Sequence, residues 1–81
     1  MLGYTCSRRT IDEALPSVDG FLDHAARAGR PRVRIIHGKG TGTLRRAVRD
    51  FMDRHPLVKG YETAVAAEGG EGVTIALLEQ V

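Results

Sequence analysis

The sequence predicts an α+β fold: a two-layer α/β sandwich with a four-stranded mixed sheet and both helices on one face. Two segments repeat their apolar residues with a helical period, and four short segments have the composition of strands. Their order along the chain is β-α-β-α-β-β. Two helices are too few to cover both faces of a four-stranded sheet, so we expect them on the same face. A chain of 81 residues suits a single domain, spanning residues 1–81.

The first helix is expected to follow a weak strand candidate at residues 2–6. It begins at Thr10, whose hydroxyl can cap the helix, and Glu13 completes the capping-box pattern. Pro16 removes one hydrogen bond after the first turn and can bend the helix, and Gly29 is a natural stop. The apolar face of this helix is expected to consist of Ile11, Leu15, Val18, Leu22 and Ala25.

The remainder of the chain is predicted to form a strand at 32–37, a loop at 38–42, a helix at about 43–54, a strand at 57–65 interrupted by Gly60, a turn at 68–72 and a strand at 73–79. In the first of these strands, Val33 and Ile35 point to one side of the sheet. The last strand is strongly apolar, which suits a central position. The inward residues of the second helix are expected to be Leu44, Ala47, Val48 and Phe51.

The net charge of +2 hides an uneven distribution along the chain. Residues 1–26 sum to −2 and residues 55–81 to −3, whereas residues 27–54 sum to +7, with eight arginines and one lysine against two aspartates. Such a concentration of positive charge favours partners that carry phosphate. Simple solvation of the surface is the alternative for any single arginine, but it explains nine cations in one segment poorly.

Composition and motifs exclude several classes of protein. The sequence has no apolar stretch near twenty residues and no signal peptide, so we expect no membrane partner. A lone Cys6 cannot form an internal disulfide, which fits a cytoplasmic location. The loop matches neither the nucleotide-binding P-loop nor the dinucleotide fingerprint. No cluster of Cys and His or pair of carboxylates adjoins it, so we expect no metal site and no cofactor in this domain, while the dependence of any activity on a divalent metal is left open.

The loop GKGTG at residues 38–42 lies between a strand and a helix, which is the arrangement of an anion site. Glycines allow a left-handed backbone, and the amides at the start of a helix lack internal partners. A tight connection is the alternative, but one glycine would suffice for it. The residues predicted to bind phosphate or nucleic acid are Gly38, Gly40, Thr41, Gly42, Arg45, Arg46 and Arg49.

His37 is the one side chain beside this loop that can transfer protons near neutral pH. It is a candidate general acid or base on a phosphodiester, with Lys39 stabilising the charge of the transition state. Donating a hydrogen bond to a phosphate is its alternative role. His24 is expected on the surface, and His55, which precedes Pro56, is expected to cap the second helix.

These residues resemble a known family. The stretch PRVRIIHGKGTGTLRRAVRDFMDRHPLVKGY, followed by EGGEGVTIALL, is similar to the Smr (small MutS-related) domain, in particular the version at the C-terminus of bacterial MutS2-type proteins. The resemblance covers roughly residues 10–79 and implies a β-α-β-α-β-β sandwich, with His37 as the histidine of the family loop. It also implies nicking endonuclease or ribonuclease activity. The full-length MutS2-type proteins carry an ATPase, which we do not expect in this chain, and are tied to suppression of recombination and to ribosome rescue.

The family usually opens with the motif L-D-x-R-G or L-D-x-H-G, which is thought to help form the active site of its nucleases. Those positions fall on Tyr4, Thr5, Cys6, Ser7 and Arg8, so the aspartate and the following Arg or His are both replaced. Residues 1–8 are therefore interpreted as a diverged end or as a junction foreign to the family. This departure argues against cleavage of nucleic acid by this chain, but it does not affect the predicted binding role of the loop.

Two functions are therefore carried forward from the sequence. The first is a domain that binds and nicks DNA or RNA through the loop. The second is a module of a MutS2-type protein that binds nucleic acid or the ribosome without cleaving it. A site for a small phosphorylated ligand is a third alternative, which the wide spread of the arginines disfavours. Base stacking is weakly supported, because the chain has only four aromatic residues, Tyr4, Phe21, Phe51 and Tyr61.

Overall fold

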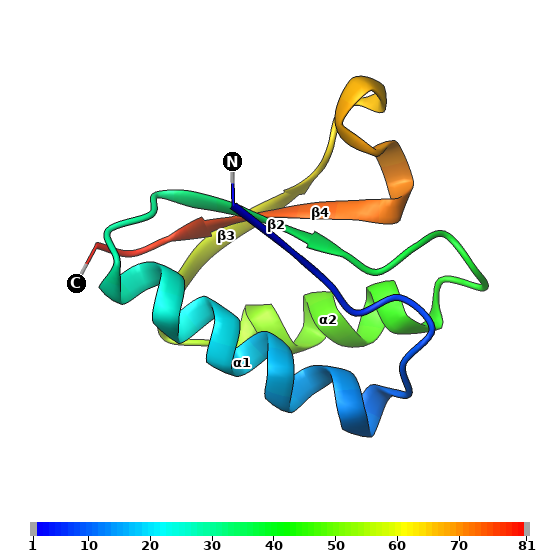
Figure 1. Cartoon of the computed structure of the whole chain (residues 1–81), viewed down its shortest axis with the longest axis horizontal. Coiled ribbons are helices and arrows are strands. Elements are labelled where there is room, and N and C mark those ends of the chain that lie inside the picture. The colour runs from blue at the N-terminus through cyan, green and yellow to red at the C-terminus, as the bar shows by residue number, and fades with distance from the viewer. Residues whose placement is uncertain (1, 81) are drawn as a thin grey trace.

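Strands and helices alternate in the predicted order β-α-β-α-β-β in the computed structural model, which describes residues 2–80. Both helices lie on one side of the sheet, so the predicted two-layer α+β sandwich is confirmed (Figure 1). Two short 3-10 turns, η1 and η2, connect the last two strands. The elements are β1 (Leu2–Thr5), α1 (Ile11–Arg27), β2 (Arg32–Ile36), α2 (Thr43–Asp53), β3 (Val58–Thr63), η1 (Ala66–Glu68), η2 (Gly70–Gly72) and β4 (Val73–Leu78).

The sheet is mixed, with the strand order β1-β2-β4-β3. β1 and β2 are parallel and are joined by α1, whereas β4 is antiparallel to both of its neighbours. The strongly apolar β4 lies in the interior of the sheet, as its composition predicts. The register of β3 shifts between Val58 and Gly60, which is where the sequence indicates an interruption.

α1 begins and ends as the sequence predicts. Thr10 Oγ1 accepts a hydrogen bond from Glu13 N at 3.3 Å, and Glu13 Oε1 accepts one from Thr10 N at 3.0 Å, which completes the capping box. At the other end, Gly29 adopts a left-handed φ of 78°. Its amide and the next one donate back to carbonyls of the last helical turn, which is the Schellman pattern. Pro16 lies within the helix without ending it.

The buried face of α1 differs from the predicted one at its first turn. Ile11 is 37% exposed and Leu15 is only half-buried, although both were assigned to the core face. Figure 1 shows the reason, because the start of α1 diverges from the sheet toward the loops at that end of the domain. The fully buried residues of α1 are Ala14, Val18, Leu22, Ala25 and Ala26.

The main core lies between the sheet and the two helices. Val33 and Ile35 of β2 point into it, as their alternation predicts. In α2, Val48 and Met52 are buried, while Leu44 and Phe51 are half-buried against the same cluster. Met52 was missed by the prediction because the predicted stripe stopped one residue short. A second apolar cluster, on the face of the sheet opposite the helices, consists of Ala64, Val73 and Ile75 with Ile36 and Leu77.

The prediction that His55 caps α2 is wrong. Its imidazole is buried, with Nε2 at 2.7 Å from Asp19 Oδ1 and Nδ1 accepting a hydrogen bond from Leu57 N at 3.1 Å. His55 therefore ties the connection between α2 and β3 to the middle of α1. His24 is exposed, as expected. Within residues 2–80, no helix is long and apolar enough to cross a membrane.

Candidate functional site

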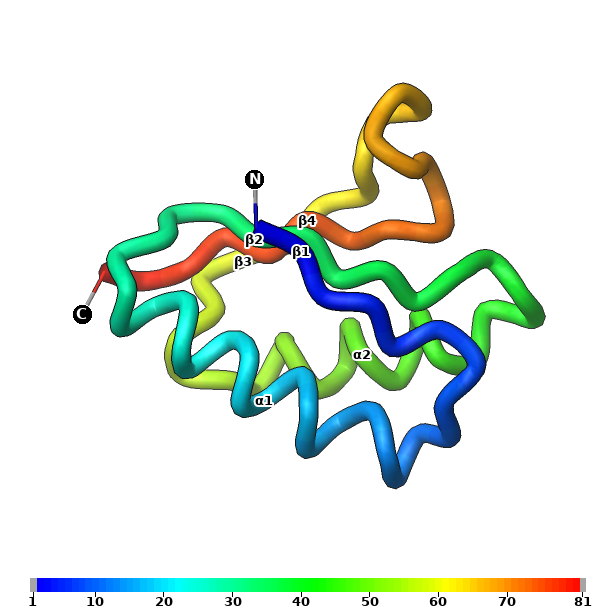
Figure 2. The backbone as a smooth tube through the Cα atoms, in the orientation of Figure 1, coloured from blue at the N-terminus to red at the C-terminus, as the bar shows by residue number. Residues whose placement is uncertain are grey.

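The loop at residues 37–42 lies at one end of the domain, beside the turn that connects β1 to α1 (Figure 2). The two segments are far apart in sequence but are in contact: a Cβ added to Gly38 would lie 3.4 Å from Cβ of Ser7. The parallel pairing of β1 with β2 causes this contact, because it brings the ends of both strands to the same edge of the sheet. The site is therefore built from two loops rather than one.

All three glycines of the loop adopt left-handed conformations. Their φ angles are 78° at Gly38, 42° at Gly40 and 86° at Gly42, which is the N-cap of α2. Side chains with a Cβ rarely adopt such angles, so the glycine content of this loop has a conformational cause. The expectation that these glycines turn the backbone sharply is thus met by the geometry.

The amides of the loop divide into two groups. The amides of His37 and Gly38 both donate to Gly72 O, at 3.1 and 3.0 Å, and the amide of Gly42 donates to Lys39 O at 3.2 Å. These groups are committed to the protein, which corrects the expectation that the whole loop presents free amides. Among the residues that the structure describes, none accepts a hydrogen bond from the amides of Lys39, Gly40 or Thr41, and all three residues are exposed.

The start of α2 adds to this anion-binding character. Gly42 offers no side chain to cap the helix, and Thr43 N reaches Thr41 Oγ1 only at 3.4 Å. The first turn of α2 carries no acidic residue that would neutralise the positive end of the helix dipole. Residues 39–41 and this end of α2 border the same pocket.

His37 does not face that solvent. It follows Val33 and Ile35 on the helix-covered side of the sheet, and the residue is only 4% exposed. Its Nδ1 lies 2.8 Å from Gly38 O and its Nε2 lies 2.8 Å from Thr74 Oγ1. Because a carbonyl oxygen can only accept, Nδ1 carries the proton, and Nε2 accepts from the hydroxyl of Thr74. Both ring nitrogens are thus occupied by the protein.

Burial lowers the pKa of His37 below its usual value, and the nearby guanidiniums of Arg49 and Arg45 lower it further. The hydrogen bond to Gly38 O acts in the opposite direction. The imidazole is therefore held in its neutral form near neutral pH, consistent with the hydrogen-bond roles assigned above.

Arg49 belongs to the same hydrogen-bond network. Its Nε donates to Thr74 Oγ1 at 3.1 Å and its Nη2 donates to Thr63 Oγ1 at 2.8 Å. Its guanidinium lies 5.3 Å from the centre of the Tyr61 ring, within the range of a cation–π contact. Burial lowers the pKa of Arg49, and the charge of Arg45 adds to this effect. Arg49 therefore points toward the sheet.

Two concave surfaces meet at the loop. The first, here called the helix groove, has a volume of about 750 Å³ and includes Arg45, Arg46 and Arg49 of α2 together with Tyr61 and Asp50. The second, here called the loop pocket, has a volume of about 300 Å³ and lies between the loop and the β1–α1 turn. The cationic residues that border it are Arg8, Arg9, Lys39 and Arg45, and none of its lining residues is acidic.

The structure thus brings together most of the site residues that the sequence suggests. Gly38, Gly40, Thr41, Gly42 and Lys39 border the loop pocket, and Arg45 borders both surfaces. Arg46 is exposed in the helix groove. The remaining two are hydrogen-bonded to Thr74: His37 borders the loop pocket and Arg49 borders the helix groove. Within residues 2–80, no three His, Cys, Asp or Glu side chains gather as a metal site would require.

Sequence reasoning missed three contributors to the site, namely Thr74, Arg8 and Arg9. Thr74 shares the helix-covered side of β4 with Ala76 and Leu78, so strand alternation could have placed it under the helices beside His37. Arg8 was set aside with residues 1–8, which were interpreted as diverged or foreign, and Arg9 was assigned no role. Only the parallel pairing of β1 with β2 brings them to the loop.

The fold and this site define a small α+β domain with a glycine-rich, cationic loop at one end. The Smr domain family matches residues 7–79, and the chain belongs to that family. Endonuclease MutS2 of Thermomicrobium roseum is 56% identical over 69 residues, which cover 85% of this chain and 9% of that protein. The chain therefore spans about one tenth of the length of the curated relatives that it matches.

Solved structures agree with this assignment. The crystal structure of the Smr domain of Thermus thermophilus MutS2 superposes with a TM-score of 0.94 at 38% identity, covering 98% of this chain and 99% of that one. YdaL, a stand-alone small MutS-related protein from Escherichia coli, superposes with a TM-score of 0.91 at 27% identity, covering 96% of this chain and 64% of that one. The match to the family runs from Ser7 to Glu79, which leaves residues 1–6 and 80–81 outside it.

Proposed function

We propose that this domain binds the phosphate backbone of DNA or RNA through the loop and the start of α2. The observation that carries the proposal is the exposed set of amides at Lys39, Gly40 and Thr41, beside the guanidiniums of Arg45 and Arg46. Main-chain amides at the start of a helix bind anions without a special side chain, and guanidinium groups match the geometry of phosphate oxygens.

The spread of the positive charge supports a polynucleotide over a small phosphorylated ligand. The helix groove and the loop pocket share Arg45, so the two surfaces adjoin, and Asp50 is the one acidic residue in their combined lining. A single phosphate would occupy only part of these surfaces, whereas a nucleic-acid backbone presents phosphates in series. Because contacts to phosphate release counterions, such binding is steeply salt-dependent.

Changing Arg45 and Arg46 together to alanine is expected to weaken binding to a short labelled duplex about tenfold at moderate salt. The plot of log K against log salt concentration is also expected to become shallower by about 1.8, because two contacts to duplex phosphates are lost. Fluorescence anisotropy at several salt concentrations measures both quantities. Arg46 is exposed and Arg45 half-buried, and neither forms an ion pair within residues 2–80, so folding should be preserved.

The matched control changes Arg30 and Arg54 to alanine, which removes the same charge. These residues follow the ends of α1 and α2, at the opposite end of the domain from the loop (Figure 1). The control is expected to keep the salt dependence of the unchanged domain. Equal losses in the two double variants would mean that only net charge matters, and the proposed site would be wrong.

Nicking of the bound strand is the second candidate function. It is favoured by the name Endonuclease MutS2 that the curated relatives carry and by the presence of His37 and Lys39 at the loop. His37 would have to break its hydrogen bond to Gly38 O or to Thr74 Oγ1 before it could exchange a proton with a substrate. Lys39 is exposed and would stabilise the charge that develops on the phosphate.

Incubating the purified domain with supercoiled plasmid tests for nicking, with Lys39→Ala and His37→Gln run in parallel. We expect any genuine activity to fall by about tenfold or more in Lys39→Ala, because one charge that stabilises the transition state is lost. Equal traces of nicked plasmid with all three proteins would indicate a contaminating nuclease. Binding without cleavage would then be the function of the domain. The assay is run with and without a divalent metal, since metal dependence stays open.

The preference of the domain for DNA or for RNA stays a prediction, and so does binding to the ribosome. The same holds for a role in suppressing recombination and for a cytoplasmic location. Measuring the affinity of the domain for duplex DNA, single-stranded RNA and purified ribosomes under one buffer condition would rank these partners directly.

A further inference from the structure

Two strands of the sheet hold the side chain of Arg49 in place. Its Nε donates to Thr74 Oγ1 on β4, and its Nη2 donates to Thr63 Oγ1 on β3. Nε–H and one N–H of Nη2 point in parallel from one edge of the planar guanidinium, so the two hydroxyls occupy that edge. The guanidinium also lies over the ring of Tyr61. These three contacts together define the position of the group and the orientation of its plane.

None of the three contacts neutralises the charge of Arg49, because two are neutral hydroxyls and the third is an aromatic ring. Within residues 2–80, no carboxylate lies within ion-pair distance of the guanidinium, although Asp50 also lines the helix groove. Burial lowers the pKa of Arg49, and the charge of Arg45 lowers it further. The charged guanidinium therefore lacks a counter-ion, which an anion in the helix groove would supply.

The other edge of the guanidinium is available for such an anion. Nη1 donates to none of the residues that the structure describes, and it is accessible to solvent. Nη1 and the second N–H of Nη2 form a fork of two parallel donors, which matches two oxygens of a phosphate. Because Arg49 lines the helix groove together with Arg45 and Arg46, this fork belongs to the surface proposed to bind nucleic acid.

We infer that Arg49 binds a backbone phosphate through this fork, and that Thr63 is a positioning residue that holds the guanidinium ready for it. Ordering a long side chain on binding costs affinity, and an arginine that is already ordered avoids much of this cost. The inference rests on the proposed function. It extends the site from the loop and the start of α2 to β3, which is an edge strand of the sheet.

Thr63→Val tests the positioning role, because Thr63 is exposed and valine keeps its shape while removing the hydroxyl that accepts from Arg49. Binding to a short labelled duplex, measured by fluorescence anisotropy, is expected to weaken about threefold. The melting temperature is expected to change by less than about 4 °C. Thr63→Ser keeps the hydroxyl and is expected to bind like the unchanged domain. Equal weakening by valine and serine would overturn the positioning role.

A double-mutant cycle tests whether Thr63 acts through Arg49. Arg49→Ala is expected to weaken binding about tenfold, because both bonds of the fork are lost. The salt dependence is expected to become shallower by about 0.9, since one contact to a duplex phosphate is removed. Adding Thr63→Val to Arg49→Ala is expected to cause no further loss. A further threefold loss would mean that Thr63 acts independently of Arg49, and the positioning role would be wrong.

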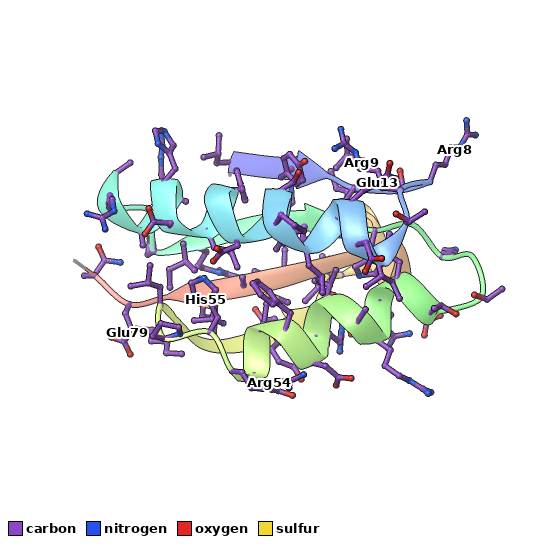
Figure 3. All side chains as sticks on the ribbon, turned by 90° about the horizontal axis from the view of Figure 1, so that it is seen from below. Arg8, Arg9, Glu13, Arg54, His55 and Glu79 are labelled. Carbon is purple, nitrogen blue, oxygen red and sulfur yellow. The ribbon has the colours of Figure 1, made fainter. Side chains whose placement is uncertain are left out.

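Arg54→Ala is the matched control, because Arg54 is an exposed arginine at the far end of α2 from the loop (Figure 3). It is expected to keep the salt dependence of the unchanged domain. If Arg49→Ala also keeps it while Arg45→Ala with Arg46→Ala binds weakly, the role of Arg49 is wrong and the proposed function stands. Absence of binding by the unchanged domain would overturn both.

Discussion

His37→Ala is expected to lower the free energy of unfolding by about 3 kcal/mol, a large share of the stability of a domain this small. The imidazole is almost fully buried, so its removal leaves a void beneath the loop. It also leaves the hydroxyl of Thr74 and the carbonyl of Gly38 without their partner. Urea unfolding followed by circular dichroism measures the change.

His24→Ala is the matched control, because His24 is exposed on α1. It is expected to change the free energy of unfolding by less than about 0.5 kcal/mol. If His37→Ala were no more damaging than this control, the imidazole would not be a structural part of the site, and the burial argument would fail.

The lowered pKa of His37 makes the stability of the folded domain depend on pH. Because its pKa is lower in the folded than in the unfolded chain, the unfolded chain binds the proton more strongly. The contribution of His37 is therefore fully present above the unfolded pKa of about 6.5 and is lost as the pH falls toward the folded pKa. The urea midpoint is expected to fall with pH in this window, and less steeply in His37→Gln. Equal slopes would show that other groups cause the change.

Thr74→Val is expected to lower the free energy of unfolding by about 2 kcal/mol, although valine has nearly the same shape. Thr74 is fully buried, and its hydroxyl donates to His37 Nε2 while accepting from Arg49 Nε at 3.1 Å. Valine leaves the imidazole nitrogen buried and unpaired and releases Arg49 from its anchor. We therefore also expect a weaker preference for one orientation of the Arg49 guanidinium at the wall of the helix groove.

Thr74→Ser separates the hydroxyl from the methyl group, since serine keeps the first and loses the second. It is expected to cost about 1 kcal/mol, less than valine. A larger loss with serine than with valine would mean that packing, and not the hydrogen bonds to His37 and Arg49, gives Thr74 its importance. Unfolding in urea distinguishes these outcomes.

The fold was largely predictable because local chemistry specifies each element. The capping box at Thr10, the stop at Gly29 and the alternation in β2 each have a local cause, and all three are found in the structure. The errors lie where tertiary packing decides. Ile11 has the right spacing for the core, but its turn lies beyond the covered part of the sheet, so it is exposed.

The candidate site was predictable only in its loop. Glycine content and position between strand and helix indicate the left-handed backbone and the exposed amides of residues 39–41. The roles of His37 and Arg49 were harder to predict, because a titratable or charged side chain beside a loop suggests exposure to solvent. Each instead finds a hydrogen-bond partner on β4, some 25 to 37 residues away in sequence.

By itself, the sequence determined the element order and the glycine-rich turn into α2, since both follow from periodicity, caps and backbone freedom. It also indicated a positive middle segment. Only the tertiary structure decided which cations share a surface: Arg32 pairs with Glu62 on the sheet, whereas Arg8 and Arg9 join the loop from an acidic segment. The reason is that the sequence gives only the order of the charges along the chain, whereas a parallel strand pair brings distant chain segments to one edge of the sheet.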